Sequence, residues 1–182
     1  MTLYAYCLMP NHVHLLARTG VTPLAKFMQG LQQSYTQRFN RVHEKVGHVF
    51  QGRYRAIVCD SDEYLLTLVR YIHLNPVRAS LAPDPGTYRY SRHQVLLTGQ
   101  PTALLDPQPV LGLLGGPTAY ARFMQDGANE GRQPGLYAMR DQQILGARAF
   151  ADVVTGSRAK MPHRLPGRRP NPPLAVCKRH LD

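Results

Sequence analysis

Two histidines, His12 and His14, stand one residue apart in the run AYCLMPNHVH at residues 5–14. A β-strand repeats every two residues, so both imidazoles would leave the same face of one strand. Two such side chains can offer a divalent metal ion two adjacent nitrogen ligands while its other positions stay open, which suits a catalytic metal. Taken alone, the motif also fits a strand with two solvent-facing histidines.

A helix is predicted directly before a second polar group. Asp60 or Ser61 can cap its start, and acidic residues fill its first turn. Apolar residues at helical spacing then form a stripe along one side of the helix. That stripe consists of Tyr64, Leu65, Leu68, Val69 and Ile72.

The second polar group is the run YIHLNPVR at residues 71–78. On the predicted helix Tyr71 and Asn75 are four residues apart and share a face, away from the apolar stripe. Pro76 disfavours helical geometry at the preceding residue, so we expect the helix to end near Leu74, with Asn75 just beyond its C-terminal end. An amide oxygen can bind a hard cation and a phenol can act as a nucleophile, although a structural tyrosine is the alternative.

Three segments in this order resemble the REP-associated tyrosine transposases, a branch of the single-tyrosine HUH transposases of the insertion-sequence type. The segments are AYCLMPNHVH (5–14), GHVFQGRY (47–54) and YIHLNPVRA (71–79), within a similarity that extends over roughly residues 3–97. The resemblance implies that His12 and His14 are metal ligands, Asn75 the third ligand and Tyr71 the nucleophile.

The resemblance also implies a fold and a reaction. The fold is α+β, a ferredoxin-like antiparallel sheet with helices packed on one face. The reaction is metal-dependent cleavage and strand transfer of single-stranded or hairpin DNA through a 5′-phosphotyrosine. Two neutral nitrogens and one neutral oxygen make a weak, open site that fits Mg²⁺ or Mn²⁺ better than Zn²⁺.

The chain departs from the family at its start, because relatives carry a first strand and helix before the histidine strand. In a ferredoxin-like sheet that strand is central, so its loss would leave two strand edges exposed. We therefore hold two hypotheses: an active nuclease and strand transferase, or a truncated or domesticated hairpin-binding protein without chemistry. An unrelated metallohydrolase is a weaker third, since few acidic residues lie near these motifs.

Charge favours a polyanionic partner, because 22 Lys and Arg against 11 Asp and Glu give a net charge of +11. If residues 49–59 form a strand, Gln51, Arg53 and Arg55 share one face, backed by an apolar face. With Arg41 and Arg78, these residues are the expected DNA contacts.

The helix predicted between the motifs begins at Thr22 or Pro23 and is expected to pack on the sheet. Its apolar residues are Leu24, Phe27, Met28, Leu31 and Tyr35. Tyr35 is the rival of Tyr71 as nucleophile, but no amide or acid accompanies it as Asn75 accompanies Tyr71.

We predict three regions: a catalytic and DNA-binding domain at 1–97, a linker with a small helical extension at 98–155, and a basic disordered tail at 156–182. Short helices are expected near 119–124 and 141–154. Three cysteines without paired or zinc-type spacing fit a reducing cytoplasm, and no apolar run is long enough to cross a membrane. Oligomeric state is left open between monomer and dimer.

Overall fold

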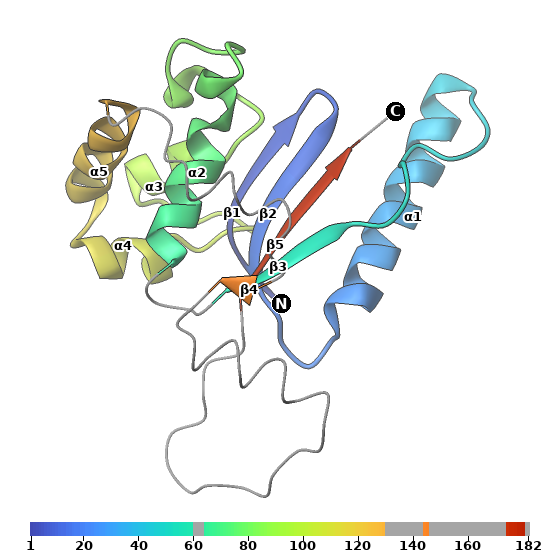
Figure 1. The fold of residues 1–182 in the computed structure, drawn as a ribbon, viewed down its shortest axis with the longest axis horizontal. Helices are drawn as coiled ribbons and strands as arrows, with labels where there is room; N and C mark the ends of the chain where they lie inside the picture. The colour runs from blue at the N-terminus through green and yellow to red at the C-terminus, as the bar shows by residue number, and fades with distance from the viewer. Residues whose placement is uncertain (60–63, 130–143, 146–173, 181–182) are drawn as a thin grey trace, which may run out of the picture.

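The computed structural model describes residues 1–59, 64–129, 144–145 and 174–180 (Figure 1). Within these ranges one sheet has the strand order β1-β2-β5-β3-β4. Its strands are β1 (Thr2–Met9), β2 (His12–Arg18), β3 (Arg55–Cys59), β4 (Ile144–Leu145) and β5 (Leu174–His180). The helices are α1 (Leu24–His43), α2 (Leu65–Arg78), α3 (His93–Thr98), α4 (Gln108–Leu114) and α5 (Pro117–Asn129). The α+β class is confirmed.

Strands β1 and β2 form an antiparallel hairpin whose turn is Pro10 and Asn11. Proline fixes the backbone angle that the first turn position needs. The outer edge of β1 is covered, since the Leu8 N–H donates to the Tyr90 carbonyl at 2.9 Å and the Tyr88 hydroxyl donates to the Leu8 carbonyl at 2.7 Å. This cover protects the sheet from pairing with another chain at that side.

The centre of the sheet is β5, which pairs antiparallel with β2 on one side and with β3 on the other. Val176 lies opposite both Leu16 and Ile57 in this register. The expectation of a disordered tail is therefore wrong for residues 174–180. The expectation of two open strand edges is also wrong, because β5 satisfies the backbone groups of β2 and β3 that face each other across the gap.

Helix α2 covers one face of the sheet and builds the core. The predicted apolar stripe is confirmed, with Leu65, Leu68, Val69 and Ile72 buried and Tyr64 half-buried. The sheet meets this stripe with Ala5, Cys7, Met9 and Leu16.

Helix α2 does not end where the sequence indicated. It continues through Pro76 to Arg78, and the Ala79 N–H closes it by donating to the Asn75 carbonyl at 2.9 Å. Proline already has a helical φ and costs one hydrogen bond, which the buried packing of α2 offsets. Asn75 is therefore inside the last turn. The predicted caps Asp60 and Ser61 lie outside the described residues.

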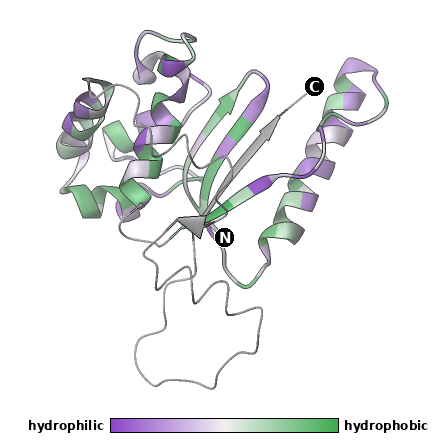
Figure 2. Cartoon of the chain, in the orientation of Figure 1, coloured by the Kyte–Doolittle hydropathy of each residue, from purple (hydrophilic) through white to green (hydrophobic). Residues whose placement is uncertain are grey.

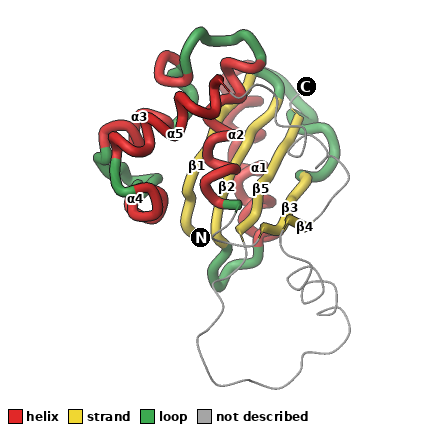
Figure 3. The backbone as a smooth tube through the Cα atoms, turned by 60° about the vertical axis from the view of Figure 1, so that its left-hand side comes forward, coloured by secondary structure: helices red, strands yellow, loops and turns green. Residues whose placement is uncertain are grey.

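Helix α1 lies on the opposite side of the sheet from α2, so the helices are not all on one face (Figures 1 and 3). Strand β2 permits this because it is apolar on both faces, with Leu16 toward the core and Val13 and Leu15 half-buried on the other side. The apolar residues of α1 were expected to pack on the sheet, but Met28 is the only residue of this helix that is buried.

The second half of the described chain extends the same core instead of forming a separate linker. Helix α5 buries Tyr120 and Met124, and α4 buries Val110 and Leu111, in one cluster with α2. The helix expected near 119–124 is present and longer. Of the helix expected at 141–154, only residues 144–145 are described, and they form β4, which pairs parallel with β3.

Candidate active site

The two imidazoles of β2 converge. His12 Nε2 and His14 Nε2 are 3.0 Å apart, and the rings meet edge to face with centroids 4.7 Å apart. His14 is buried against the core and His12 is half-buried near the turn. The period of the strand brings both side chains to the α2 side, as the sequence predicted. The two ring nitrogens are within hydrogen-bonding distance of each other and so lie together at one place on this side of the sheet.

Asn11 orients the first of these imidazoles. Its Oδ1 lies 2.7 Å from His12 Nδ1 and can only accept, so the proton of a neutral His12 stands on Nδ1. His12 Nε2 then presents its lone pair, which is the form that binds a metal. Asn11 is a residue of the site that the sequence motifs did not indicate. Its signal was its place in a two-residue turn directly before His12.

Tyr71 approaches the histidines from α2. Its ring lies edge to face with the His14 ring, with centroids 5.6 Å apart and planes at 83°. The Arg78 guanidinium carbon lies 5.8 Å from the centre of the Tyr71 ring. The structure therefore brings a phenol, an imidazole pair and a fixed positive charge into one region between β2 and α2.

Asn75 belongs to the same helical turn as Tyr71. Its Nδ2 donates to the Tyr71 carbonyl at 2.7 Å, and the side chain is half-buried. Because the amide nitrogen is used inside the helix, the amide oxygen is the atom left to accept a cation or a hydrogen bond.

A buried polar cluster ties α2 to the helices behind it. The Tyr120 hydroxyl lies 2.8 Å from His73 Nδ1 and 2.6 Å from His93 Nδ1, so it donates to one ring and accepts from the other. Burial lowers the pKa of His73 to about 3 and that of His93 to about 4, and it raises the pKa of Tyr120 well above its usual value. All three groups are therefore neutral at pH 7, and they fix the helix that carries Tyr71.

The residues expected to contact DNA lie in two separate regions of the structure. Gln51, Arg53, Arg55 and Arg41 are all exposed, on α1, in the loop before β3 and at the start of β3. The strand expected over 49–59 is shorter, so only Arg55 of this set is on a strand. Arg78 lies instead beside Tyr71.

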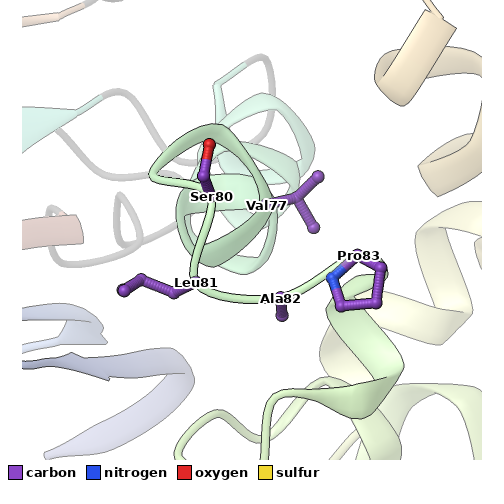
Figure 4. Close-up of a pocket in the computed structure, with 5 residues that line it drawn as sticks. All are labelled: Val77, Ser80, Leu81, Ala82 and Pro83. Atoms are coloured by element: carbon purple, nitrogen blue, oxygen red, sulfur yellow. The ribbon is translucent and has the colours of Figure 1, made fainter.

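A shallow pocket of about 420 Å³ lies just beyond the end of α2 (Figure 4). Its lining is Val77, Ser80, Leu81, Ala82 and Pro83. One hydroxyl among apolar atoms gives no group for acid–base or metal chemistry. The pocket is therefore separate in chemistry from the histidine pair.

Two features are absent from the described residues. No group of three or more His, Cys, Asp or Glu side chains is arranged to hold a metal ion there. Among the helices of that part of the chain, none is both long and apolar enough to cross a membrane.

Comparison with known proteins gives one match. Residues 1–75 match the family described as "Transposase IS200 like". No curated protein and no solved structure matches the chain. The matched segment runs from β1 to Asn75 on α2 and so contains the histidine pair and Tyr71. Over residues 1–75 the chain is therefore similar to IS200-like transposases.

Proposed function

We propose that this protein is a transposase that cleaves single-stranded or hairpin DNA with Tyr71 and a divalent metal, and rejoins strands through a 5′-phosphotyrosine. The single observation that carries the proposal is the meeting of the His12–His14 pair with Tyr71 across β2 and α2. The family match supports the transposase function. The geometry supports this particular chemistry.

The donor set would suit a divalent cation with open positions. His12 and His14 bring their Nε2 atoms to 3.0 Å from each other on the α2 side of β2. With the Asn75 amide oxygen as third ligand, Mg²⁺ or Mn²⁺ is the expected ion. Such an ion would withdraw charge from the scissile phosphate when bound.

The covalent step belongs to Tyr71. Its phenolic oxygen loses a proton and attacks the phosphorus, the bond from phosphorus to the 3′ oxygen breaks, and the 3′ oxygen leaves with a proton as a hydroxyl. The enzyme then holds the 5′ phosphate as a phosphotyrosine. A 3′-hydroxyl can reverse the reaction and join strands without ATP, because the ester keeps the energy of the broken bond.

Neighbouring side chains position and stabilise this step. Arg78 keeps a positive charge close to the Tyr71 ring, where a phosphate and a phenolate would both carry negative charge. His14 packs against the same ring and limits its rotation. The exposed Arg41, Arg53 and Arg55 are suited to bind phosphates further along the strand.

The decisive experiment is incubation with end-labelled hairpin DNA and Mn²⁺, followed by a denaturing gel. We expect a covalent protein–DNA adduct that Tyr71→Phe abolishes while hairpin binding survives, since the variant removes one oxygen and keeps the ring. Tyr35→Phe is the matched control and should still form the adduct.

Two results would contradict the proposal in different ways. An adduct that persists in Tyr71→Phe and disappears in Tyr35→Phe would move the nucleophile to α1. Hairpin binding without any adduct in the unmodified protein would identify a DNA-binding protein that does no chemistry.

A further inference from the structure

Helix α1 carries an aromatic surface that the candidate active site does not use. Tyr35, Phe39 and His43 follow one another at intervals of four residues, and Phe50 joins them from the loop after the helix. We call these four residues the aromatic ladder. The ring centroids of Tyr35 and Phe39 are 6.0 Å apart with planes at 26°, and those of Phe39 and His43 are 4.3 Å apart.

The loop after α1 holds part of the aromatic ladder in place. Glu44 turns the chain in the left-handed conformation, and the Asn40 amide donates to the Gly47 carbonyl at 3.0 Å. This fold-back brings Phe50 to 5.5 Å from Tyr35 between ring centroids. A defined loop therefore completes the ladder at its inner end.

The ladder is nevertheless open to an outside partner. Tyr35 is 44% exposed, and Met28 is the only buried residue of the twenty in α1. Apolar and polar bands alternate along the whole helix, which stands clear of the helices on the other side of the sheet (Figure 2). His43 is also exposed, and Phe39 and Phe50 are half-buried, so the described part of the chain leaves ring surface on which other flat rings can stack.

Charge decides which partner fits. Residues 1–59 contain seven Lys or Arg residues and one acidic residue, Glu44. Lys45 Nζ lies 5.8 Å from the centre of the Phe39 ring, and Arg38 and Arg41 are exposed on the same half of α1. A second copy of this chain would bring like charges together, whereas a nucleic acid strand would pair bases with rings and phosphates with cations.

We propose that the aromatic ladder is a stacking platform for the bases of single-stranded DNA, a proposal that rests on the proposed function. From Tyr35 to His43 the helix rises by eight residue steps, or about 12 Å, which is room for about three stacked nucleotides. It lies at the same end of the molecule as the β1–β2 turn beside His12 (Figure 1). The histidines face α2 and the ladder lies on the other side of the sheet, so a strand bound at both places would pass over the β1–β2 turn.

The test compares two labelled single strands of twelve nucleotides that cannot form hairpins, one normal and one with abasic sites in place of its central bases. Both carry the same phosphates. A stacked base contributes about 1–3 kcal/mol, so we expect the full-length protein to bind the normal strand roughly 5- to 150-fold more tightly. Fluorescence anisotropy measures both affinities.

Variants assign the difference to the rings. Phe39→Leu and Tyr35→Leu keep apolar bulk and helix propensity but remove the aromatic face, so the ratio should fall toward one while the salt dependence stays unchanged. Arg38→Gln is the matched control and should weaken both strands equally and lessen the salt dependence. Thermal melting by circular dichroism checks that each variant is folded.

Three outcomes would overturn the inference. The first is equal affinity of the unmodified protein for normal and abasic strands. The second is an unchanged ratio in folded Phe39→Leu. The third is sedimentation that reveals a dimer which Phe39→Leu dissociates, since the ladder would then bind a second copy. None of these measurements depends on cleavage, so the inference about the ladder can be refuted even if the Tyr71 adduct forms.

Discussion

His14 on β2 and Tyr71 on α2 lie edge to face, with ring centroids 5.6 Å apart, although 57 positions (71 − 14) separate them in the chain. The contact joins the strand that carries the imidazole pair to the helix that carries Tyr71 and Asn75. A change in the packing of α2 on β2 would therefore move the phenol relative to both histidines.

Loss of either histidine should remove metal binding and leave DNA binding largely intact. We expect His12→Ala and His14→Gln each to abolish the adduct and to lower the affinity for Mn²⁺. The loss should exceed the roughly 10- to 100-fold that follows when a residue hydrogen-bonded to a metal ligand is removed. Titration calorimetry with Mn²⁺ measures the affinity. His48→Ala, an exposed loop histidine, is the control. Equal loss of hairpin affinity in the two histidine variants would indicate a structural role instead.

Asn11 should act through His12. Asn11→Ala removes the acceptor that keeps the proton on His12 Nδ1, so Mn²⁺ affinity should fall roughly 10- to 100-fold with little change in melting temperature. Asn11→Asp keeps an acceptor at the same place and should bind Mn²⁺ at least as well as the unmodified protein. If both variants bind Mn²⁺ equally, Asn11 serves only the turn.

A proline in the middle of β5 should destabilise the whole sheet. Val176→Pro removes a backbone N–H from a strand that is paired on both sides. A loss of about 3 kcal/mol would lower the melting temperature by roughly 6–12 °C for a chain of this size. Val176→Thr keeps the N–H and the branched shape, and is the matched control. An unchanged melting temperature in Val176→Pro would mean that the central strand does not contribute to stability.

Acid should destabilise the fold through the buried histidines. The folded pKa values of His73 and His93, about 3 and about 4, lie below the unfolded value near 6.5. Below pH 6.5 the unfolded chain takes up protons that the folded chain refuses, so stability present above that pH is lost as pH falls toward 4.

The size of this effect can be measured by urea unfolding. Each histidine should cost about 1 kcal/mol of unfolding free energy between pH 7 and pH 5.5. His93→Gln should reduce the pH dependence by about half, because one of the two titrating groups is gone. A pH dependence that is unchanged in this variant would show that other groups cause it.

Short-range patterns predicted the parts of the site that lie within single elements. The period of two in β2 gave the shared face of His12 and His14, and the helical stripe gave the buried face of α2. Amphipathic spacing identified the apolar side of α1 but could not show whether another element packs against it. The rule for residues before proline failed at Asn75, since packing of α2 outweighs a local preference.

Long-range pairing was beyond such patterns. Residues 174–180 follow a basic, proline-rich stretch, and their run LAVCKRH is too short to identify as a strand without its partners. A strand between β2 and β3 depends on the two edges that receive it, and those edges are distant in sequence. Tyr120 was missed for the same reason, since its role depends on His73 and His93 from two other helices.

The position of β5 also governs the order in which this protein can be made. A ribosome delivers β2 and its histidines early, and β5 only after every other described residue. Until then β2 and β3 have no strand between them, so a nascent chain holds the histidines without the sheet that fixes them. Closing the sheet is a high-contact-order event and should be the slow phase of folding. The DNA cleavage proposed above is therefore expected only of chains whose synthesis has passed His180.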